Sequence, residues 1–240
     1  MIHTPDLNKE NLKLLISSVK YKGCIVTGGR CGIGCRYCYL RESGKLSPYI
    51  PLNIPFISKS DFRKTVFTAK IYKYRSVSLG DGVDLISSEP FIHPLIYEFI
   101  EELEASSFIN SISITTSGMY IERAQYELLR KCKKINWAIS CSSLSEDGRK
   151  RIVLTKNCER LIDFLSFLHD KKWKTVSSLQ LITYGLRYFR EDIEFIRNRF
   201  PKFLPALYLR ELAYNKFFSR KAKSFIDHCR KEFKKVLEYS

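Results

Sequence analysis

The sequence lacks any long apolar run and is poor in glycine and proline. No stretch approaches the roughly 20 uninterrupted apolar residues that a membrane span requires, so we expect no membrane-spanning helix. Its 240 residues include only 11 Gly and 8 Pro, too few for a fibrous repeat or a long disordered chain. With 45% hydrophobic residues, residues 1–240 are predicted to form a single globular domain with one sizeable core.

Acidic residues and cysteines are also scarce. The 25 Asp and Glu against 41 Lys and Arg give a net charge of +16, so the surface should attract anions such as nucleic acid, phosphorylated metabolites or an acidic partner. Eight Cys are too few for a disulfide-stapled miniprotein. Residues 1–20 show no basic-then-apolar leader, because Asp6, Lys9 and Glu10 interrupt them. A cytoplasmic location is therefore predicted.

Short β-branched runs alternate with amphipathic segments from residue 21 onward, which is typical of helices flanking a parallel sheet. Strands are predicted at 22–27, within 77–87, and at 111–116, 135–141, 176–183 and 206–212. Helices are predicted at 59–72 with Ser60 as N-cap, from Pro94 onward, and at 121–131, 157–170, 191–199 and 220–238. Six strands, each followed by a helix, indicate an α/β fold, an open partial (β/α)6 barrel over about residues 21–212. A basic C-terminal helix is expected at about 216–240.

Three closely spaced cysteines follow the first predicted strand, in the sequence Cys31-Gly-Ile-Gly-Cys35-Arg-Tyr-Cys38. The glycines allow the backbone to fold tightly, so that three thiolates converge on one iron–sulfur cluster. Three ligands on a four-iron cluster leave one iron open. The alternative is a structural zinc site, which takes four protein ligands. Cys24 is the candidate for the fourth ligand, although it lies within the first predicted strand.

The segment Cys31-x3-Cys35-x-Tyr37-Cys38 resembles the signature of the radical S-adenosyl-L-methionine (SAM) enzymes, in which an aromatic residue also precedes the third cysteine. The resemblance implies a radical SAM barrel and a [4Fe-4S] cluster held by Cys31, Cys35 and Cys38, whose open iron chelates SAM. It also implies an enzyme. An electron from a donor such as flavodoxin or ferredoxin cleaves SAM to methionine and a 5′-deoxyadenosyl radical, which abstracts hydrogen from the substrate.

Polar turns at the ends of later strands resemble the SAM-binding turns of this family. Ser87-Ser88-Glu89-Pro90 falls where the family has a Gly-Gly-Glu-Pro-like turn that contacts the SAM amino group. Residues 115–118 resemble a Thr-x-Asn-Gly turn, and two serines that end the fourth strand match residues that hold the ribose or the carboxylate. The resemblance therefore implies cofactor-binding roles for Tyr37, Ser87, Ser88, Glu89, Thr116, Ser117, Ser140 and Ser142.

Two arginines follow the fourth predicted strand. Arg149 and Arg151 are candidate partners of the SAM carboxylate, because a guanidinium group suits that geometry. Solvated surface charge is the alternative for both.

The run at 27–40 is also similar to the cluster loop of the spore photoproduct lyase-like group. Tyr37 and Tyr39 match two tyrosines of that group that are implicated in radical handling, so Tyr39 is a candidate catalytic residue. Ile86 lies where the group has its hydrogen-donating cysteine. The likeness therefore concerns scaffold and cofactor, and not the lyase reaction.

Four other cysteines lie outside the triplet and Cys24. Cys141 ends a strand between two predicted SAM-binding serines, so it is a candidate catalytic hydrogen donor; a buried packing thiol is the alternative. Cys132, Cys158 and Cys229 lie in helical patterns and are predicted to be packing residues.

Three functions are compatible with these features. The first is a radical SAM enzyme that acts on an unidentified anionic substrate, either a small molecule or a nucleic acid. The second is a radical SAM enzyme that modifies a protein, as a glycyl-radical activase or peptide-modifying enzyme does. The third is a non-catalytic Fe–S or zinc protein that binds nucleic acid through residues 216–240, which contain eight Lys and Arg but only three acidic residues.

Overall fold

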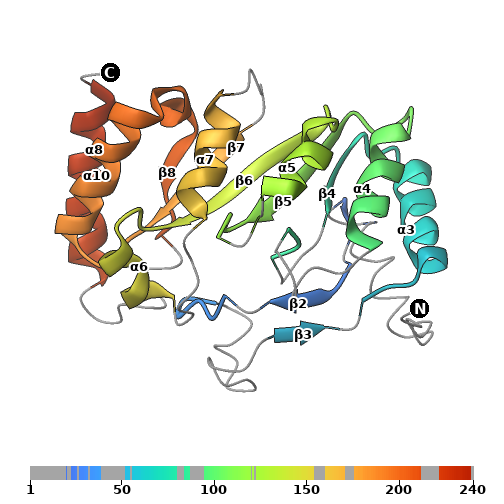
Figure 1. Ribbon diagram of the computed structural model, residues 1–240, viewed down its shortest axis with the longest axis horizontal. Helices are drawn as coiled ribbons and strands as arrows, with labels where there is room; N and C mark the ends of the chain where they lie inside the picture. The colour runs from blue at the N-terminus through green and yellow to red at the C-terminus, as the bar shows by residue number, and fades with distance from the viewer. Residues whose placement is uncertain are drawn as a thin grey trace. The chain divides into compact units, whose positions relative to one another are not determined.

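The computed structural model describes most of the chain, which forms two compact units (Figure 1). The described residues are 20, 23–25, 27–31, 33–38, 52–54, 56–79, 84–86, 95–119, 121, 123–153, 160–170, 176–211 and 222–238. The first unit comprises Met1–Cys31, Leu52–Thr116 and Glu122–Trp137, and the second comprises Gly32–Pro51, Ser117–Ile121 and Ala138–Ser240. That residues 1–240 act as a single domain stays a prediction.

Six strands form one sheet in the order β1-β4-β5-β6-β7-β8. β1 pairs with β4, β4 with β5, and β7 with β8, each time in parallel. The strands are β1 (Cys24–Ile25), β4 (Ser76–Leu79), β5 (Ser111–Thr116), β6 (Ile135–Ser142), β7 (Val176–Ile182) and β8 (Leu207–Leu209). β1 and β8 are the two ends of this order, so the sheet is open. The predicted α/β class and its six parallel strands are confirmed.

Helices alternate with these strands. They are α3 (Lys59–Ile71), α4 (Leu95–Ala105), α5 (Arg123–Arg130), α6 (Glu146–Ile152), α7 (Leu161–Asp170), α8 (Leu186–Arg199), the 3₁₀ helix η1 (Pro201–Ala206) and α10 (Ala222–Glu238). Over the residues that the structure describes, none of them is long and apolar enough to cross a membrane.

The structure corrects the sequence prediction at three helices. α3 is capped by Ser58 and not by Ser60, because the Ser58 hydroxyl oxygen accepts a hydrogen bond from Asp61 N–H at 3.1 Å. α8 begins at Leu186, five residues before the predicted start at Glu191. α6 is absent from the prediction, since its seven residues include Gly148 and carry no apolar stripe.

A second, two-stranded sheet lies in the first unit. β2 (Gly29–Cys31) pairs in antiparallel fashion with β3 (Leu52–Ile54), with Cys31 opposite Leu52. Strands of three residues are too short to show an alternating pattern, so the sequence does not predict them. The pairing fixes the backbone of Cys31, one of the predicted iron ligands.

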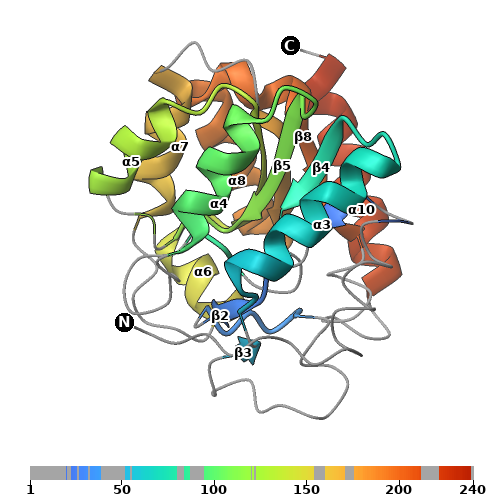
Figure 2. The ribbon, with the colours of Figure 1, turned by 90° about the vertical axis from the view of Figure 1, so that its right-hand side faces the viewer.

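Buried aromatic rings join the helices of the first unit. α3 and α4 lie side by side against the strands (Figure 2). The rings of Phe62 in α3 and Phe99 in α4 stack in parallel with their centroids 3.9 Å apart, and both side chains are buried. Ile112 and Ile114 of β5 are also buried, and they alternate with less buried serines along the strand. Truncating either ring to alanine should cost about 3–5 kcal/mol of stability.

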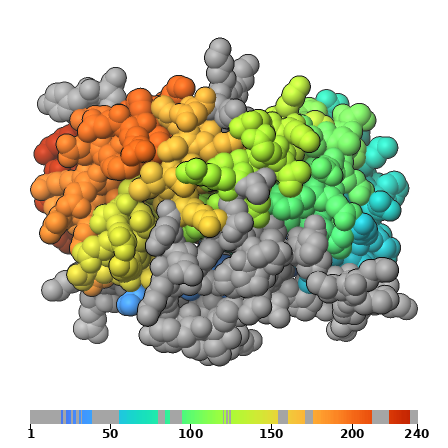
Figure 3. All heavy atoms as spheres, viewed as in Figure 1, coloured from blue at the N-terminus to red at the C-terminus, as the bar shows by residue number. Residues whose placement is uncertain are grey.

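The second unit is built around β6, β7 and β8. α8 turns Phe189, Ile193 and Ile196 inward, and all three are buried. α10 packs along α8 and buries Ile226 and Cys229 (Figures 1 and 3). In the space-filling view, the orange atoms of α8 lie against the red atoms of α10 (Figure 3). These helices hold the strands whose ends carry several of the predicted site residues.

Candidate active site

The cluster loop, residues 33–38, carries two of the three predicted iron ligands. Gly34 has a φ of +64°, in the left-handed region that glycine adopts without strain. The backbone then turns, so that Cys38 N–H donates to the Cys35 carbonyl oxygen at 3.2 Å. Both cysteines are half-buried. The loop therefore holds Cys35 and Cys38 within one tight turn.

Main-chain hydrogen bonds fasten the cluster loop to the end of α6. Cys35 forms an isolated antiparallel bridge with Val153, and Arg36 N–H donates to the Ile152 carbonyl oxygen at 3.0 Å. α6 is itself capped by Ser145, whose hydroxyl oxygen accepts from Gly148 N–H at 3.3 Å. The loop is thus anchored to the end of α6 through its backbone.

The residue types of the triplet fit an iron–sulfur cluster. Cys31, Cys35 and Cys38 are half-buried and lie in no disulfide bond, and thiolate sulfur is the ligand that such clusters take. Cys31 belongs to the first unit, and the other two to the second. Across the described parts of the chain, no three His, Cys, Asp or Glu side chains are grouped as a metal-ion site. The ligand assignment therefore stays a prediction that rests on residue type and spacing.

Tyr37 connects the cluster loop to the end of β6. Its ring is buried, and its hydroxyl oxygen lies 3.0 Å from the Ser142 hydroxyl oxygen. Burial is the main reason why the pKa of the Tyr37 hydroxyl is raised well above its usual range, so Tyr37 keeps its proton at neutral pH. The guanidinium carbon of Arg210 lies 5.8 Å from the centre of the ring. Tyr37 and Ser142, both predicted to bind SAM, are thus brought together.

We use the name strand edge for the C-terminal ends of β6, β7 and β8. A second hydroxyl group and a cation lie together there. Ser143 N–H donates to the Ile182 carbonyl oxygen at 3.0 Å, which aligns the ends of β6 and β7. Arg210 follows β8 directly, and its Nη1 donates to the Ser140 hydroxyl oxygen at 2.9 Å. Arg210 was not predicted as a site residue, although the sequence shows a basic residue directly after an apolar strand.

Cys141 lies between the two serines and faces the other side of β6. Its side chain is fully buried, and successive residues of a strand point to opposite faces. Burial raises the pKa of the Cys141 thiol well above its usual range, and the nearby Asp192 carboxylate adds to that effect. A hydrogen-donating role for Cys141 stays a prediction. The packing roles predicted for Cys132 and Cys229 are confirmed by their burial, while Cys158 lies outside the described residues.

Asp192 is a buried acid of α8 that the sequence analysis missed. Its Oδ1 accepts from Leu144 N–H at 2.7 Å and from the Ser143 hydroxyl at 3.1 Å. Its Oδ2 is buried and has no hydrogen-bond partner among the described residues. Burial raises the pKa of Asp192 to about 7, against the lowering effects of its hydrogen bonds and of Arg149. Asp192 therefore fixes the turn that follows Ser142.

The turn after β5 contains two more of the predicted SAM-binding residues. In the first unit, the Thr116 hydroxyl donates to Asp84 Oδ1 at 2.7 Å, and both residues are buried. In the second unit, the Ser117 hydroxyl oxygen accepts from Met119 N–H at 3.3 Å. Gly118 has a φ of +68°, and a Cβ there would lie 2.7 Å from the Phe164 ring, so this turn requires glycine. Asp84 was not predicted, because its region reads as a glycine-rich turn.

The two arginines after β6 have structural partners. Arg149 is buried, and its Nη1 donates to the carbonyl oxygens of Ser143 at 3.1 Å and Leu144 at 2.7 Å. The alternative of a solvated Arg149 is therefore wrong. Arg151 is exposed and pairs with Asp147 at 3.7 Å.

Four predicted site residues lie outside the described residues: Tyr39, Ser87, Ser88 and Glu89. Their assignments as a catalytic residue and as contacts of the SAM amino group stay predictions.

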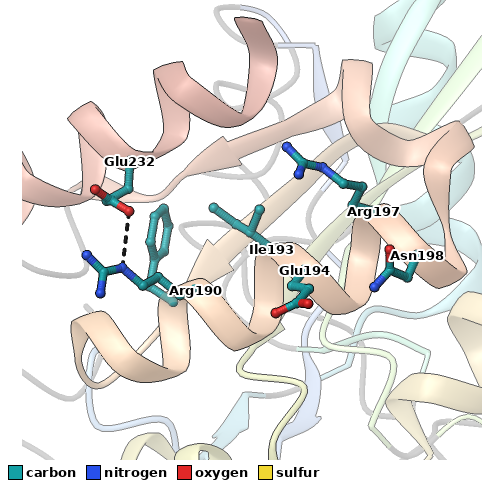
Figure 4. A pocket seen from close by; sticks show the side chains of 7 residues that line it. Arg190, Ile193, Glu194, Arg197, Asn198 and Glu232 are labelled. Atoms are coloured by element: carbon teal, nitrogen blue, oxygen red, sulfur yellow. Dashed lines mark hydrogen bonds and ion pairs between the residues drawn. The ribbon is translucent and has the colours of Figure 1, made fainter. Parts of the chain in front are cut away.

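The helix face, formed by the exposed sides of α8 and α10, carries a shallow pocket of about 260 Å³. Arg190 and Glu232 close one end of it through an ion pair at 3.1 Å (Figure 4). Further along α8, Glu194, Arg197 and Asn198 line the pocket (Figure 4). None of the predicted site residues lines it, so we assign it no role in the chemistry.

Comparisons of sequence agree with the cysteine motif. The radical SAM superfamily model matches residues 25–199. The chain is 26% identical over 178 residues to molybdenum cofactor biosynthesis protein 1 of Drosophila melanogaster, an alignment that covers 71% of this chain and 28% of that protein. It is 24% identical over 148 residues to GTP 3′,8-cyclase of Lactiplantibacillus plantarum, covering 60% of this chain and 41% of that protein. The alignments thus span less than half of these relatives. The likeness to spore photoproduct lyases is not confirmed by them.

Comparisons of structure agree with the fold. The crystal structure of Streptococcus suis SuiB bound to S-adenosylmethionine matches 78% of this chain and 41% of that chain, with a TM-score of 0.53 and 16% identity. The crystal structure of SuiB bound to the precursor peptide SuiA matches 97% of this chain and 55% of that chain, with a TM-score of 0.55 and 16% identity. At this identity, the matches establish a shared fold.

Proposed function

Because this chain belongs to the radical SAM superfamily, whose members use a [4Fe-4S] cluster and SAM, we propose that it is an enzyme that abstracts hydrogen from an anionic small molecule. When bound, the cluster and SAM supply the one-electron cleavage that yields a 5′-deoxyadenosyl radical. In this proposal Cys31, Cys35 and Cys38 are the iron ligands. A flavodoxin or ferredoxin supplies the electron, and the reaction takes place in the cytoplasm.

The observation that carries the proposal is the bond between the cluster loop and the strand edge. The hydroxyl groups of Tyr37 and Ser142 lie 3.0 Å apart, between a loop that holds two of the predicted iron ligands and the end of a parallel strand. Ligands of open parallel sheets bind beyond the carboxyl ends of the strands. A SAM molecule chelated at the loop would therefore meet the polar groups of β6.

The residues of the chain have separate tasks in this reaction. Tyr37, Ser140 and Ser142 bind and orient SAM through neutral hydroxyl groups. Ser87, Ser88, Glu89, Thr116 and Ser117 complete the SAM contacts. Cys141 is a candidate to return hydrogen to a product radical, and Tyr39 is a candidate to handle one.

Two features support an anionic substrate. The net charge of +16 favours anions in general. Two relatives are named GTP 3′,8-cyclase, which makes a nucleoside triphosphate the first substrate to try.

A peptide substrate is the second candidate, and it depends on a different observation. The structure of SuiB that matches 97% of this chain was solved with its precursor peptide SuiA. The third function considered from the sequence, a non-catalytic Fe–S or zinc protein, disagrees with the family and with the enzymes among the relatives.

The experiment is anaerobic reconstitution with iron and sulfide, reduction with dithionite, and measurement of 5′-deoxyadenosine. We expect about four irons per chain, and SAM cleavage that GTP accelerates more than a mixture of random peptides does. A reconstituted protein that holds its cluster but cleaves no SAM would contradict the proposal. Acceleration by peptides and not by GTP would favour the second candidate.

A further inference from the structure

Arg210 is fixed at the strand edge by its own backbone. It follows β8 directly, and its N–H donates to the Leu181 carbonyl oxygen of β7 at 3.1 Å. Its half-buried side chain reaches β6, where Nη1 donates to the Ser140 hydroxyl oxygen at 2.9 Å. The guanidinium group therefore lies beside hydroxyl groups that the proposed function assigns to SAM.

The charge of Arg210 has no carboxylate partner among the residues that the structure describes. Its side-chain contacts within the described residues are with neutral groups, namely the Ser140 hydroxyl and the Tyr37 ring at 5.8 Å. Glu211 is the next residue along the chain, but it pairs with Arg230 at 2.6 Å. Partial burial of a cation without a counter-ion costs free energy, and a bound anion would offset that cost.

We infer that Arg210 binds an oxyanion, either a carboxylate or a phosphate group, of a ligand at the strand edge. The planar guanidinium fork matches two oxygens of such a group. An arginine offers five N–H donors, and the bond to Ser140 uses one of them and fixes the plane of the fork. This inference rests on the proposed function, which supplies the two sources of the oxyanion. They are the phosphates of a substrate and the carboxylate of SAM.

The chain offers a matched control for this position in Arg190. Arg190 is exposed on the helix face and already pairs with Glu232 at 3.1 Å. Arg210→Gln and Arg190→Gln each remove one positive charge, so any effect of net charge on anion binding is the same in both variants. Only the first variant removes the cation beside Ser140.

The test measures dissociation constants of wild type, R210Q, R210K and R190Q by calorimetry at one salt concentration. The probes form two pairs, each with and without the oxyanion: SAM with decarboxylated SAM, and GTP with guanosine. Pyrophosphate is a fifth probe. We expect R210Q to weaken the binding of SAM or of GTP by roughly 10- to 100-fold, the effect of losing a charge-assisted pair. R210K should lose less, since it keeps the charge without the fork.

The pattern of affinity losses identifies the source of the oxyanion. A loss confined to GTP and pyrophosphate assigns the oxyanion to a substrate phosphate, and a loss confined to SAM assigns it to the cofactor carboxylate. Decarboxylated SAM and guanosine should bind wild type and R210Q equally. The inference is overturned if R210Q and R190Q lose affinity to the same extent, if neither loses any, or if wild type binds no anionic probe.

The inference and the proposed function fail separately. If wild type cleaves SAM and R210Q binds every probe as tightly as wild type does, only the role of Arg210 is refuted. Wild type that cleaves no SAM, but binds GTP or pyrophosphate through Arg210, refutes the proposed function alone. Circular dichroism and the urea midpoints of R210Q and R210K show whether the fold survives each substitution.

Discussion

The strand edge and the helix face of the second unit use their charges in opposite ways. On the helix face, exposed cations meet acids: Arg190 and Lys235 both contact Glu232, at 3.1 and 3.3 Å. At the strand edge, the Tyr37 and Ser142 hydroxyl groups lie within hydrogen-bond distance, and the Ser140 hydroxyl accepts from Arg210, a half-buried cation. Both regions contain basic residues, but Arg210 is half-buried and its described neighbours are neutral, whereas Arg190 and Lys235 are exposed and paired with an acid.

This difference shows that net charge alone does not locate an anion site. Exposed ion pairs contribute about 0–1 kcal/mol each, because water already solvates both partners. A partly buried cation is screened less, so its interaction with an anion is stronger. Much of the net charge of +16 therefore lies on the exposed surface of the chain. The position of an arginine, and not the net charge, decides whether it binds an anion strongly.

The largest expected effect comes from removing Cys38, a predicted iron ligand of the cluster loop. Cys38→Ala should lose the cluster and reduce 5′-deoxyadenosine formation to the level without enzyme, because two thiolates do not hold a four-iron cluster that needs three. Iron content and the visible absorption of the reconstituted protein measure it. Cys132→Ala is the matched control, since Cys132 is a buried packing thiol. Equal iron content in the two variants would contradict the assignment of the iron–sulfur cluster to the cluster loop.

A large effect on stability is expected at Asp192. Asp192→Ala leaves Leu144 N–H and the Ser143 hydroxyl without their acceptor in a buried turn, and should lower the free energy of unfolding by about 2–3 kcal/mol. Urea unfolding measures it. Asp192→Asn keeps an acceptor oxygen and should recover most of the loss at pH 7.

The same residue makes stability depend on pH. The pKa of Asp192 is about 7 in the folded protein and 3.8 ordinarily, so the folded state binds the proton more tightly. Its contribution to stability is complete below about pH 4, and is lost as the pH rises through 7. Wild type should therefore lose stability relative to D192N between pH 4 and 7, by up to about 1.4 kcal/mol per pH unit. A constant difference between the two proteins across this range would contradict the raised pKa.

A smaller effect is expected when the bond between the cluster loop and β6 is removed. Tyr37→Phe leaves the Ser142 hydroxyl, which is fully buried, without this partner and should cost about 1–2 kcal/mol. Tyr208→Phe is the control, because Tyr208 is an exposed residue of β8 and its loss should fall within about 0.5 kcal/mol. Equal stability of the two variants would mean that the hydroxyl contact does not fasten the loop.

The smallest effect is expected on the helix face. Glu232→Gln breaks the pairs with Arg190 and Lys235, and should change the free energy of unfolding by less than about 1 kcal/mol. SAM cleavage should stay at the wild-type rate. A clear loss of cleavage would mean that the helix face takes part in the reaction.

The sequence predicted what depends on local patterns. The strand at 111–116 was predicted with its observed bounds, because alternating Ile and Ser or Thr produce a period of two. Cysteine spacing predicts the cluster loop, and Ser140 and Ser142, predicted to end the fourth strand, lie at the end of β6. Each of these signals lies within a few consecutive residues.

Contacts between distant residues could not be predicted in this way. Arg210 and Ser140 are 70 positions apart, and only the pairing of strands brings them together. Asp192 reads as a polar position in an amphipathic helix, because nothing local reveals that it faces a buried turn. Four of the predicted site residues lie outside the described part of the chain, so their placement stays a prediction.

The short helix α6 has a consequence for exchange of its backbone amides. Seven residues with Gly148 near their start form a weak helix in isolation, and a Cβ at 148 would lie 2.9 Å from the Ser143 Cβ, so no better helix former fits. The helix owes its persistence to its partners, among them the Arg36 N–H that bonds to its last carbonyl oxygen. We therefore expect any ligand that orders the cluster loop to slow deuterium uptake in α6. The exchange rate of this helix would then report whether the ligand is bound to the loop.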